Sequence, residues 1–457
     1  MGSEEAQRGA LRGRPLSLRQ NFSWTFVGNV VYAACQWGML IALAKLGSSA
    51  MVGRFSLGLA VTAPVIMLTN LQLRNVQATD AKGEYSFGDY LGLRLVTTAL
   101  ALGGIAAIVG VSGYGPQTAW VVLLVGVAKG IESVSDIVYG LLQQRERMDR
   151  VAQSMVLRGT LSLAAMAAIL YVTRNVALGV CALAGSWLIV VLAYDLPNAT
   201  RLLVAGGGAQ AVGRCAAGRA PSYPRPRWVP KDLGSLVWLS LPLGVVMMLM
   251  SLNGSIPRYF IQHHAGEAEL GIFSALAYLQ IAGTTVVRAL GQAVLPRLAK
   301  CYASGDAATF CRLLGKQLLI GLALGLGGIL VALVAGRPLL TLIYKPEYGA
   351  RADVFVWVMV GAACAYLASF LGYGMTAARR YRDQMPLYLA VVAASGVSCW
   401  LLVPRYGIRG AAMSLAIAYL VNACGAAVIN LMALRAMGAG AEEAQTSRDR
   451  PSDADID

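Results

Sequence analysis

Apolar stretches of about twenty residues recur along almost the whole chain, and they constrain its fold more than any other feature. A bilayer core of about 30 Å is crossed by a helix of roughly 20 apolar residues. By this measure the sequence predicts twelve membrane-spanning helices. They are expected at 21–44, 54–79, 90–112, 118–144, 151–171, 176–197, 232–260, 268–296, 313–335, 352–376, 385–403 and 410–434. The predicted fold class is therefore an all-α integral membrane protein.

The composition supports this class and excludes several others. Only 13% of the 457 residues are charged, whereas soluble domains carry about a quarter. A net charge of +15 is high enough to suggest nucleic acid, but the basic residues follow membrane topology, so no nucleic-acid partner is expected. The eight cysteines form no C-x-x-C motif, which argues against a disulfide framework and against a zinc site. No metal or organic cofactor is expected.

The distribution of Lys and Arg predicts the orientation in the membrane. Basic residues are concentrated on the cytoplasmic side of membrane proteins. With the N-terminus in the cytoplasm, the inside segments hold 24 of the 38 basic residues and the outside loops hold six. We therefore expect both termini to be cytoplasmic.

A Gly-, Ala-, Pro- and Arg-rich stretch divides the predicted spans into two sets of six. This stretch, 198–231, is expected to be a flexible cytoplasmic linker. The domain organisation predicted is an N-terminal tail at 1–20, a six-helix lobe at 21–197, the linker, a second six-helix lobe at 232–437 and a disordered acidic tail at 438–457.

The two lobes share short sequence matches that indicate an internal repeat. G-x-F-S occurs at Gly53–Ser56 and again at Gly271–Ser274, each time near the start of the second span of a lobe. Tyr139 and Tyr373 each precede a glycine and are followed by Arg and Asp at matching positions near the end of the fourth span. Since six is an even number, both lobes run the same way through the membrane. Parallel repeats of this kind are typical of transporters, with the substrate site between the halves.

The fourth span contains three charged residues, Lys129, Glu132 and Asp136. Their spacing of i, i+3 and i+7 places them on one helical face. An ion inside a bilayer costs several kcal/mol, so such residues face a partner or water.

Other spans add the basic residues Arg74, Arg94, Arg158, Arg258 and Arg288. Arg94 and Arg158 lie near a cytoplasmic end and are expected to extend towards the headgroups, as Arg258 can towards the outside. Arg74 and Arg288 occupy the equivalent second spans of the two lobes, with Arg288 opposite Asn70 in the repeat.

Two interpretations of these charges are open. Six intramembrane cations face two anions, and an unpaired guanidinium in a dry core is costly, which favours a water-filled cationic cavity. The alternative is internal pairing of Lys129 with Glu132 and of an arginine with Asp136. In the cavity interpretation Arg74, Arg288, Lys129 and Arg258 bind an anionic substrate. Asp136 and Glu132 are then the candidates for coupling to H⁺ or Na⁺.

Residues 21–80, which begin NFSWTFVGNVVYAACQWGML, resemble the start of bacterial polysaccharide transporters of the O-antigen flippase type. That family belongs to the multidrug/oligosaccharidyl-lipid/polysaccharide exporter superfamily, and the resemblance extends over all twelve spans. It implies two six-helix bundles that form a V around a central cavity with alternating access. It also implies a substrate of undecaprenyl diphosphate carrying an oligosaccharide, moved across the bacterial inner membrane for O-antigen, capsule or exopolysaccharide assembly.

A diphosphate substrate agrees with the cationic spans, because guanidinium groups bind phosphates through two parallel hydrogen bonds. Protein partners would be a polysaccharide polymerase and glycosyltransferases. Two alternatives remain. A multidrug extrusion antiporter of the same superfamily would favour an acidic cavity. A membrane polysaccharide polymerase or ligase would need a larger outside loop than 336–351. The chain lacks a nucleotide-binding G-x-x-x-x-G-K-[ST] motif, and it is not expected to be an enzyme.

Overall fold

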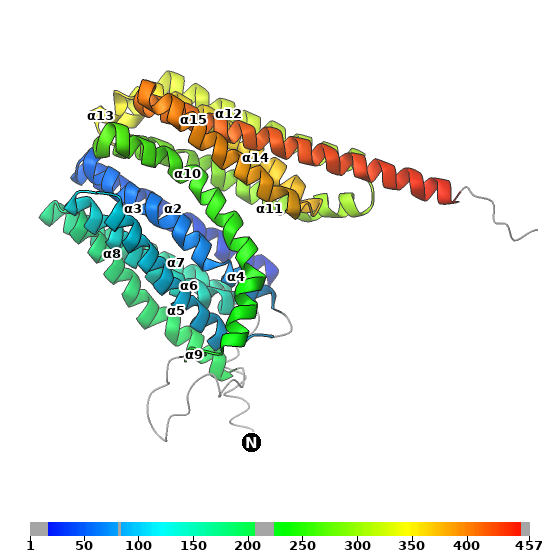
Figure 1. Cartoon of the computed structure of the whole chain (residues 1–457), viewed down its shortest axis with the longest axis horizontal. Helices are drawn as coiled ribbons and strands as arrows, with labels where there is room; N and C mark the ends of the chain where they lie inside the picture. The colour runs from blue at the N-terminus through cyan, green and yellow to red at the C-terminus, as the bar shows by residue number, and fades with distance from the viewer. Residues whose placement is uncertain (1–16, 81–83, 206–223, 449–457) are drawn as a thin grey trace, which may run out of the picture. The chain divides into compact units, whose positions relative to one another are not determined.

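The structure, a computed structural model of the chain, describes residues 17–80, 84–205 and 224–448, and every regular element in them is a helix (Figure 1). The first elements are α2 (Leu18–Leu46), α3 (Ser49–Asn70), α4 (Leu73–Thr79), α5 (Phe87–Val111), α6 (Pro116–Gln144), α7 (Met148–Thr173), α8 (Val176–Val190), a π-helical turn (Val191–Asp195) and α9 (Leu196–Ala205). They are followed by α10 (Pro230–Tyr278), α11 (Gln280–Ala303), α12 (Ala307–Ile343), α13 (Pro346–Gly349), α14 (Ala352–Ala377) and α15 (Tyr381–Arg448).

Each of the twelve predicted spans corresponds to a helical segment. Among the described residues, nine stretches are long and apolar enough to cross a membrane. Two of them each contain two predicted spans, joined at Gly266 and at Gly407, whose positive φ values of 81° and 56° interrupt α10 and α15. Glycine alone adopts such angles without strain. The fourth predicted span is α6, which falls outside the nine. The prediction of an all-α membrane protein with about twelve spans is confirmed.

The second span differs from its prediction because it is broken. Leu71 and Gln72 adopt left-handed angles, with φ of 51° and 52°, and separate α3 from α4. Residues other than glycine pay about 1–3 kcal/mol for such angles, and strained positions of this kind concentrate at functional sites. The sequence gives no glycine or proline signal for the break, so an uninterrupted helix over 54–79 was expected there.

The chain divides into two compact units, Met1–Ser251 and Leu252–Asp457, so the division falls within α10. The N-terminal turns of α10 pack on the first unit. Leu236 is fully buried in that unit's core, and Gly244 lies against the backbone of Leu68 and Leu71. The expected division at the linker 198–231 stays a prediction.

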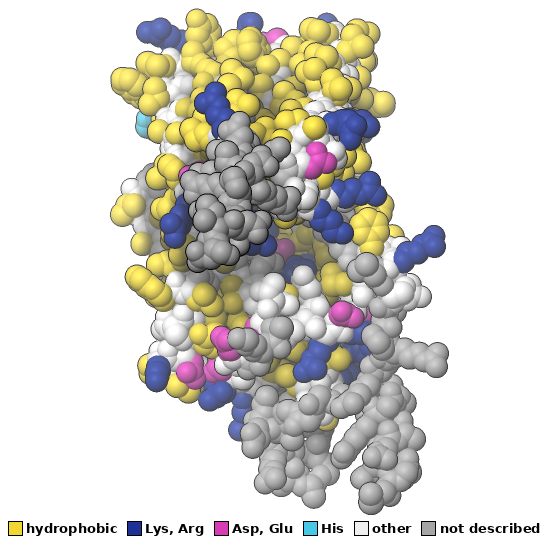
Figure 2. All heavy atoms as spheres, turned by 90° about the vertical axis from the view of Figure 1, so that its right-hand side faces the viewer, with side chains coloured by type: hydrophobic (Ala, Val, Ile, Leu, Met, Phe, Trp, Pro, Cys, Tyr) yellow, Lys and Arg dark blue, Asp and Glu magenta, His cyan; other side chains and the backbone are white. Residues whose placement is uncertain are grey.

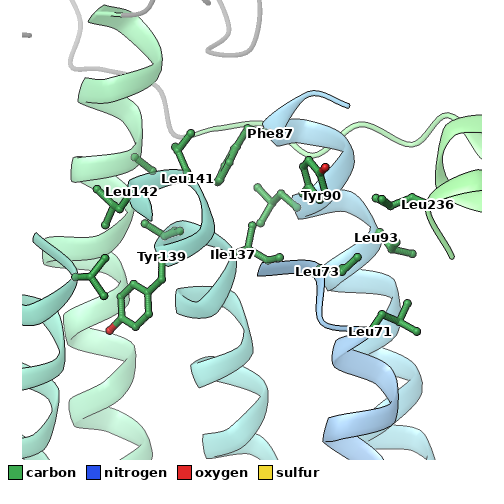
Figure 3. Close-up of a cluster of buried hydrophobic side chains, with 14 residues drawn as sticks. Leu71, Leu73, Phe87, Tyr90, Leu93, Ile137, Tyr139, Leu141, Leu142 and Leu236 are labelled. Carbon is green, nitrogen blue, oxygen red and sulfur yellow. The ribbon is translucent and has the colours of Figure 1, made fainter. Parts of the chain in front are cut away.

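The core of the first unit joins the ends of α3, α4, α5, α6 and α10 (Figure 3). Burying such apolar side chains contributes about 1.5–3 kcal/mol each. Fully or almost fully buried members of this cluster are Leu73, Tyr90, Ile137, Leu142 and Leu236. Because Leu71 and Leu73 both belong to the cluster, the strained break between them is held on each side by packing.

The end of the predicted linker is docked on α5. The backbone N–H of Arg227 donates to the carbonyl of Gly88 over 2.9 Å, and its guanidinium lies 3.4 Å from the Asp89 carboxylate. A Cβ at Gly92 would lie 2.2 Å from the Arg227 carbonyl oxygen, so this close approach requires glycine. Residues 206–223 of the predicted linker lie outside the described residues.

The core of the second unit joins the ends of α11, α12, α14 and α15, through residues that include Leu298, Phe310, Met375 and Val391. The last element, α15, continues to Arg448, further than the predicted end of the lobe at 437.

The two Tyr-Gly pairs that suggested the repeat have similar surroundings. A Cβ at Gly140 would lie 2.3 Å from Oε1 of Gln77, and a Cβ at Gly374 would lie 2.3 Å from Oδ1 of Asn430. In each unit the missing side chain admits an amide group from a neighbouring helix, but the two helices, α4 and α15, are not ones that the repeat pairs, and the equivalence of α6 and α14 stays a prediction.

Basic side chains are exposed near the turn between α11 and α12, where Arg297, Lys300, Arg312 and Lys316 lie. Figure 2, in which the right-hand side of Figure 1 faces the viewer, shows Lys and Arg side chains spread over this face among hydrophobic ones. This is the pattern expected of a cytoplasmic surface.

The orientation can be tested with single cysteines in a variant that lacks the native ones. His263, in α10, and Arg145, after α6, are both exposed, and we expect them on the outer and inner sides respectively. A membrane-impermeant maleimide should label His263→Cys in intact cells and reach Arg145→Cys only after permeabilisation. Labelling of Arg145→Cys in intact cells would reverse the orientation.

Candidate functional site

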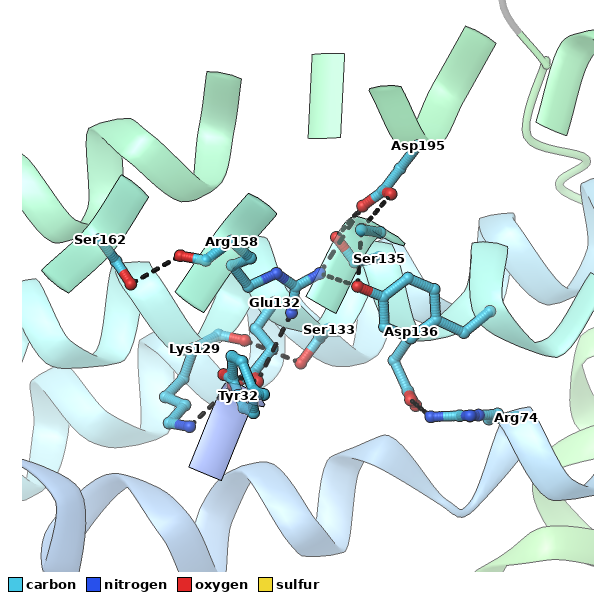
Figure 4. A network of polar contacts seen from close by, with 12 residues as sticks. Tyr32, Arg74, Lys129, Glu132, Ser133, Ser135, Asp136, Arg158, Ser162 and Asp195 are labelled. Atoms are coloured by element: carbon cyan, nitrogen blue, oxygen red, sulfur yellow. Dashed lines mark hydrogen bonds and ion pairs between the residues drawn. The ribbon is translucent and has the colours of Figure 1, made fainter. Parts of the chain in front are cut away.

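The three charged residues of α6 all have partners of opposite charge in the first unit (Figure 4). Nζ of Lys129 lies 2.7 Å from Oε2 of Glu132, one helical turn away. Both side chains are 26% exposed, so the pair lies at the edge of the packed interior. This is one of the two pairings that the internal-pairing interpretation predicts.

Glu132 connects three helices. Its Oε1 accepts a hydrogen bond of 2.9 Å from the hydroxyl of Tyr32 on α2, and Nη1 of Arg158 on α7 lies 3.5 Å away. With Lys129 on α6 itself, the carboxylate has three donors. A buried carboxylate needs such partners, because an unpaired one would cost several kcal/mol.

Arg158 is buried, and the expectation that it reaches the cytoplasmic headgroups is wrong. Its side chain is only 3% exposed and lies between Glu132 and Asp195, with Nη2 3.6 Å from the Asp195 carboxylate. Asp195 is fully buried and accepts hydrogen bonds of 2.6 Å from the hydroxyls of Ser135 and Ser154. The attraction of the Arg158 guanidinium to two carboxylates outweighs the hydration that it would gain at the headgroups, so the side chain stays buried.

Sequence reasoning missed Asp195. It lies near the predicted end of the sixth span, where an acidic residue is unremarkable. In the structure it ends a π-helical turn, Val191–Asp195. Such turns occur mostly as bulges within α-helices and often at functional sites. The available signal was an acidic residue within an apolar run, which the placement near a helix end concealed.

Asp136 is shared by two arginines. Its Oδ1 lies 3.5 Å from Nη1 of Arg74, and its Oδ2 lies 3.5 Å from Nη2 of Arg94. Arg94 is fully buried and also donates to the side-chain oxygen of Asn70, so the expectation that it reaches the headgroups is wrong as well. Ser133 donates to the same Asn70 oxygen over 3.0 Å.

Two aromatic rings complete the network. The Trp187 ring centroid lies 5.4 Å from Nζ of Lys129 and 5.6 Å from Cζ of Arg158. The Tyr139 ring lies close to Arg158 and Arg74 in the same way. A cation over an aromatic face gains about 0.5–2 kcal/mol. A small pocket beside Lys129 is lined by Trp187 and Gln36, among others.

The ion pairs show how the positive and negative charges of this network in the first unit compare. Four cations, Arg74, Arg94, Lys129 and Arg158, stand against three carboxylates, because Asp195 adds to the two counted from the sequence. The internal-pairing interpretation therefore holds for Lys129, Glu132 and Asp136. One positive charge remains in excess, and it lies at the shared Asp136.

The two candidate arginines of the second unit have no ion pair with any described residue. Arg288, on α11, is exposed, and its backbone carbonyl accepts a hydrogen bond of 3.4 Å from the Tyr373 hydroxyl. Arg258 is half-buried and donates to the carbonyl of Gly254 on its own helix. No group of three or more metal-ligating side chains occurs in the described parts of the chain.

The buried pair of Arg158 and Asp195 should be important for stability. Asp195→Asn leaves the guanidinium with a single carboxylate partner in a dry interior, so we expect the free energy of unfolding to fall by about 3 kcal/mol. The measurement is denaturant or thermal unfolding of the purified protein in detergent.

The control is Asp383→Asn, which removes a pair with Arg380 whose side chains are 42% and 36% exposed at 3.7 Å. An exposed pair contributes less than about 1 kcal/mol. Equal losses from the two substitutions would contradict a structural role for Asp195.

Comparison with known proteins was made over the whole chain. No family model matches it. The chain is 27% identical over 405 residues to the capsular polysaccharide biosynthesis protein CapF of Staphylococcus aureus, and the match covers 88% of this chain and 96% of CapF.

Several solved structures have the same fold. The lipid II flippase MurJ in an inward closed conformation matches with a TM-score of 0.71 and 9% identity, over 91% of each chain. An inward-facing multidrug resistance MATE-family transporter matches with a TM-score of 0.64 and 15% identity, over 94% of this chain and 98% of that one. A MOP-superfamily transporter from Pyrococcus furiosus matches with a TM-score of 0.61 and 16% identity, with the same coverage. The chain therefore has the fold of these solved transporters, and its similarity to CapF agrees with the resemblance to bacterial polysaccharide transporters.

Proposed function

We propose that the protein is a flippase that moves an undecaprenyl-diphosphate-linked oligosaccharide across the bacterial inner membrane by alternating access. Similarity to a capsular polysaccharide biosynthesis protein along nearly its whole length supports this, as does a fold shared with a lipid II flippase. The product would enter O-antigen, capsule or exopolysaccharide assembly. Glycosyltransferases would supply the substrate, and a polysaccharide polymerase would take the product.

The observation that carries the proposal is the excess positive charge at Arg74. Its carboxylate partner, Asp136, is shared with Arg94, and the contact of 3.5 Å is long for a charged hydrogen bond. Nε of Arg74 donates to the side chain of Gln143 over 3.2 Å, whereas Nη2 donates to no described protein atom. Because the side chain is 29% exposed, this guanidinium can bind a phosphate without first losing a strong partner.

The position of Arg74 on the backbone agrees with a binding role. It lies one residue after the start of α4, directly after the left-handed break at Leu71 and Gln72. Broken helices of this kind surround the substrate sites of many transporters.

In the second unit, Arg288 is proposed to supply a further contact to the anionic headgroup. It is exposed, it has no ion pair with a described residue, and the repeat places it on the equivalent of the Arg74 helix. Lys129 and Arg258 are proposed to add positive potential only, since each already has a close partner at Glu132 and Gly254 respectively.

Asp136 and Glu132 are proposed to couple transport to H⁺ or Na⁺. Both carboxylates are more than a quarter exposed, and each is held by cations that a coupling ion would have to replace. Such exchange on opening of the cavity would link ion movement to substrate release.

For Asp136, we expect Asp136→Asn to abolish ion-dependent transport. Because Arg94 then keeps only Asn70 as a partner among the described residues, stability should also fall, but folded protein should remain at a level sufficient for the assay. The asparagine oxygen can still accept the hydrogen bond from Arg74, but the side chain no longer carries the negative charge that exchanges a cation. Uptake of labelled substrate into vesicles, with and without an ion gradient, measures the first quantity, and size-exclusion chromatography measures the second. Loss of folded protein would instead support a purely structural role for this carboxylate.

A multidrug extrusion antiporter is the second candidate, favoured by the match to MATE-family structures. Such a pump for cationic drugs would need an unpaired acidic site, whereas the three network carboxylates of the first unit all face arginine or lysine. Expression in a drug-sensitive strain separates the two functions, because only a pump would raise resistance to cationic compounds.

Substitution of the two exposed arginines tests the diphosphate site. Lysine keeps the charge but loses the planar pair of donors, so Arg74→Lys and Arg288→Lys should each reduce transport roughly tenfold, the value of about one charge-assisted hydrogen bond. Alanine at either position should abolish transport. The assay is surface polysaccharide restored in a flippase-null strain.

The matched control is Arg297→Lys, because Arg297 is exposed on the same helix as Arg288 and has no ion pair with a described residue. It should leave transport unchanged. Arg94 and Arg158 are unsuitable controls, since both are buried. Full activity of both Arg74→Lys and Arg288→Lys would leave only a diffuse positive potential.

A further inference from the structure

The ring of Tyr139 lies beneath two guanidinium groups. Cζ of Arg74 lies 5.4 Å from the ring centroid, and Cζ of Arg158 lies 5.3 Å from it. One guanidinium belongs to the partly exposed end of the network and the other to its buried part. The ring therefore stands between the proposed diphosphate contact and the buried ion pairs.

The hydroxyl of Tyr139 is fixed by two hydrogen bonds. Nη2 of Arg158 donates to it over 2.9 Å, and it lies 2.7 Å from the hydroxyl of Ser154. Ser154 uses its own hydrogen to donate to Asp195 over 2.6 Å. It must therefore accept the hydrogen of Tyr139. The phenol is thus held in one orientation from its polar end.

The other end of the side chain is held by packing. Tyr139 is only 4% exposed and belongs to the core cluster of the first unit, where its phenol oxygen points away from the labelled leucines (Figure 3). The following residue, Gly140, lies close to the Arg74 backbone, since a Cβ there would be 3.4 Å from the Arg74 Cα. The backbone segments that carry the Tyr139 ring and the Arg74 side chain are therefore in close contact.

Three residues of α6 contact the Arg74 side chain, and they share one helical face. Asp136 contacts Nη1, Gln143 accepts from Nε, and the ring of Tyr139 lies under the plane. Their spacing of i, i+3 and i+7 is that of a single face. None of these contacts involves Nη2 of Arg74, which has no hydrogen bond to a described protein atom.

We propose that Tyr139 is a positioning residue, whose fixed ring holds the Arg74 guanidinium with its free edge directed at the diphosphate of the substrate. The proposal rests on the proposed function, which assigns the ligand. An arginine side chain has several rotatable bonds, and a rigid aromatic surface reduces the freedom that binding would otherwise remove. The ring acts on the ligand only through Arg74.

The test measures binding of undecaprenyl diphosphate to the protein in lipid nanodiscs. Tyr139→Leu should weaken binding about fivefold, the size expected of one partly desolvated cation–π contact. Tyr139→Phe keeps the ring and loses the hydroxyl, so its affinity should stay within about twofold of the wild type. Equal weakening by both variants would show that the ring held by packing does not itself position Arg74, and it would overturn the proposal.

A double-mutant cycle shows whether the ring acts through Arg74. In an Arg74→Ala background, Tyr139→Leu should cause no further loss of affinity, because its target is gone. Full additivity would overturn the positioning role. A trifluorinated phenylalanine at position 139 covers the case in which Tyr139→Leu does not fold. It keeps the shape of Phe while weakening the ring's attraction for cations, and it should weaken binding relative to Tyr139→Phe.

The outcomes separate this proposal from the proposed function. If the wild-type protein does not bind undecaprenyl diphosphate, the proposed function fails and the positioning role fails with it. If the wild type binds and Arg74→Ala weakens binding, but Tyr139→Leu does not, the function stands and only the positioning role is refuted. Thermal unfolding of each variant confirms that affinities are compared between folded proteins.

Discussion

The cost of placing ions in a low-dielectric layer determines the arrangement of the first unit. Arg158 has no route to water, so its helix must pack where two carboxylates can reach it. Those carboxylates come from α6 and from the π-helical turn after α8, while Tyr32 brings α2 to the same point. Breaking one member of such a set leaves the others uncompensated. The charges therefore specify which helices meet, in addition to whatever they do for a ligand.

The proposed repeat does not extend to these charges. The match of Tyr139 with Tyr373 places Ala363, Tyr366 and Phe370 of α14 opposite Lys129, Glu132 and Asp136. All three are buried, and the Tyr366 hydroxyl donates to the Gln280 carbonyl. Packing and hydrogen bonds between uncharged groups thus hold α14 at these positions, and Arg288 has no ion pair with a described residue. At these matched positions α6 has charged side chains in ion pairs, whereas α14 has buried uncharged side chains.

The positions of the spans were predictable because hydropathy is a local property of the sequence. Every predicted span falls on helical segments, although the second and the eighth each cross from one helix to the next. The pairing of Lys129 with Glu132 was also accessible, since one helical turn separates them. What could not be predicted depends on contacts between helices. Arg94 and Arg158 seemed free to reach water until their carboxylates were located, and the break at Leu71 and Gln72 is stabilised by tertiary packing.

The charged face of α6 has a consequence for how the nascent chain enters the membrane. A lysine or aspartate near the centre of a helix costs about 2.5–3.5 kcal/mol during insertion by the translocon. With three charged residues, α6 is absent from the stretches apolar enough to cross alone, although its neighbours α5 and α7 are among them. Its partners Arg94 and Arg158 lie on those two neighbours. Because those neighbours carry the arginines that pair with Asp136 and Glu132, the acidic charges of α6 gain these partners only once α5, α6 and α7 have packed together.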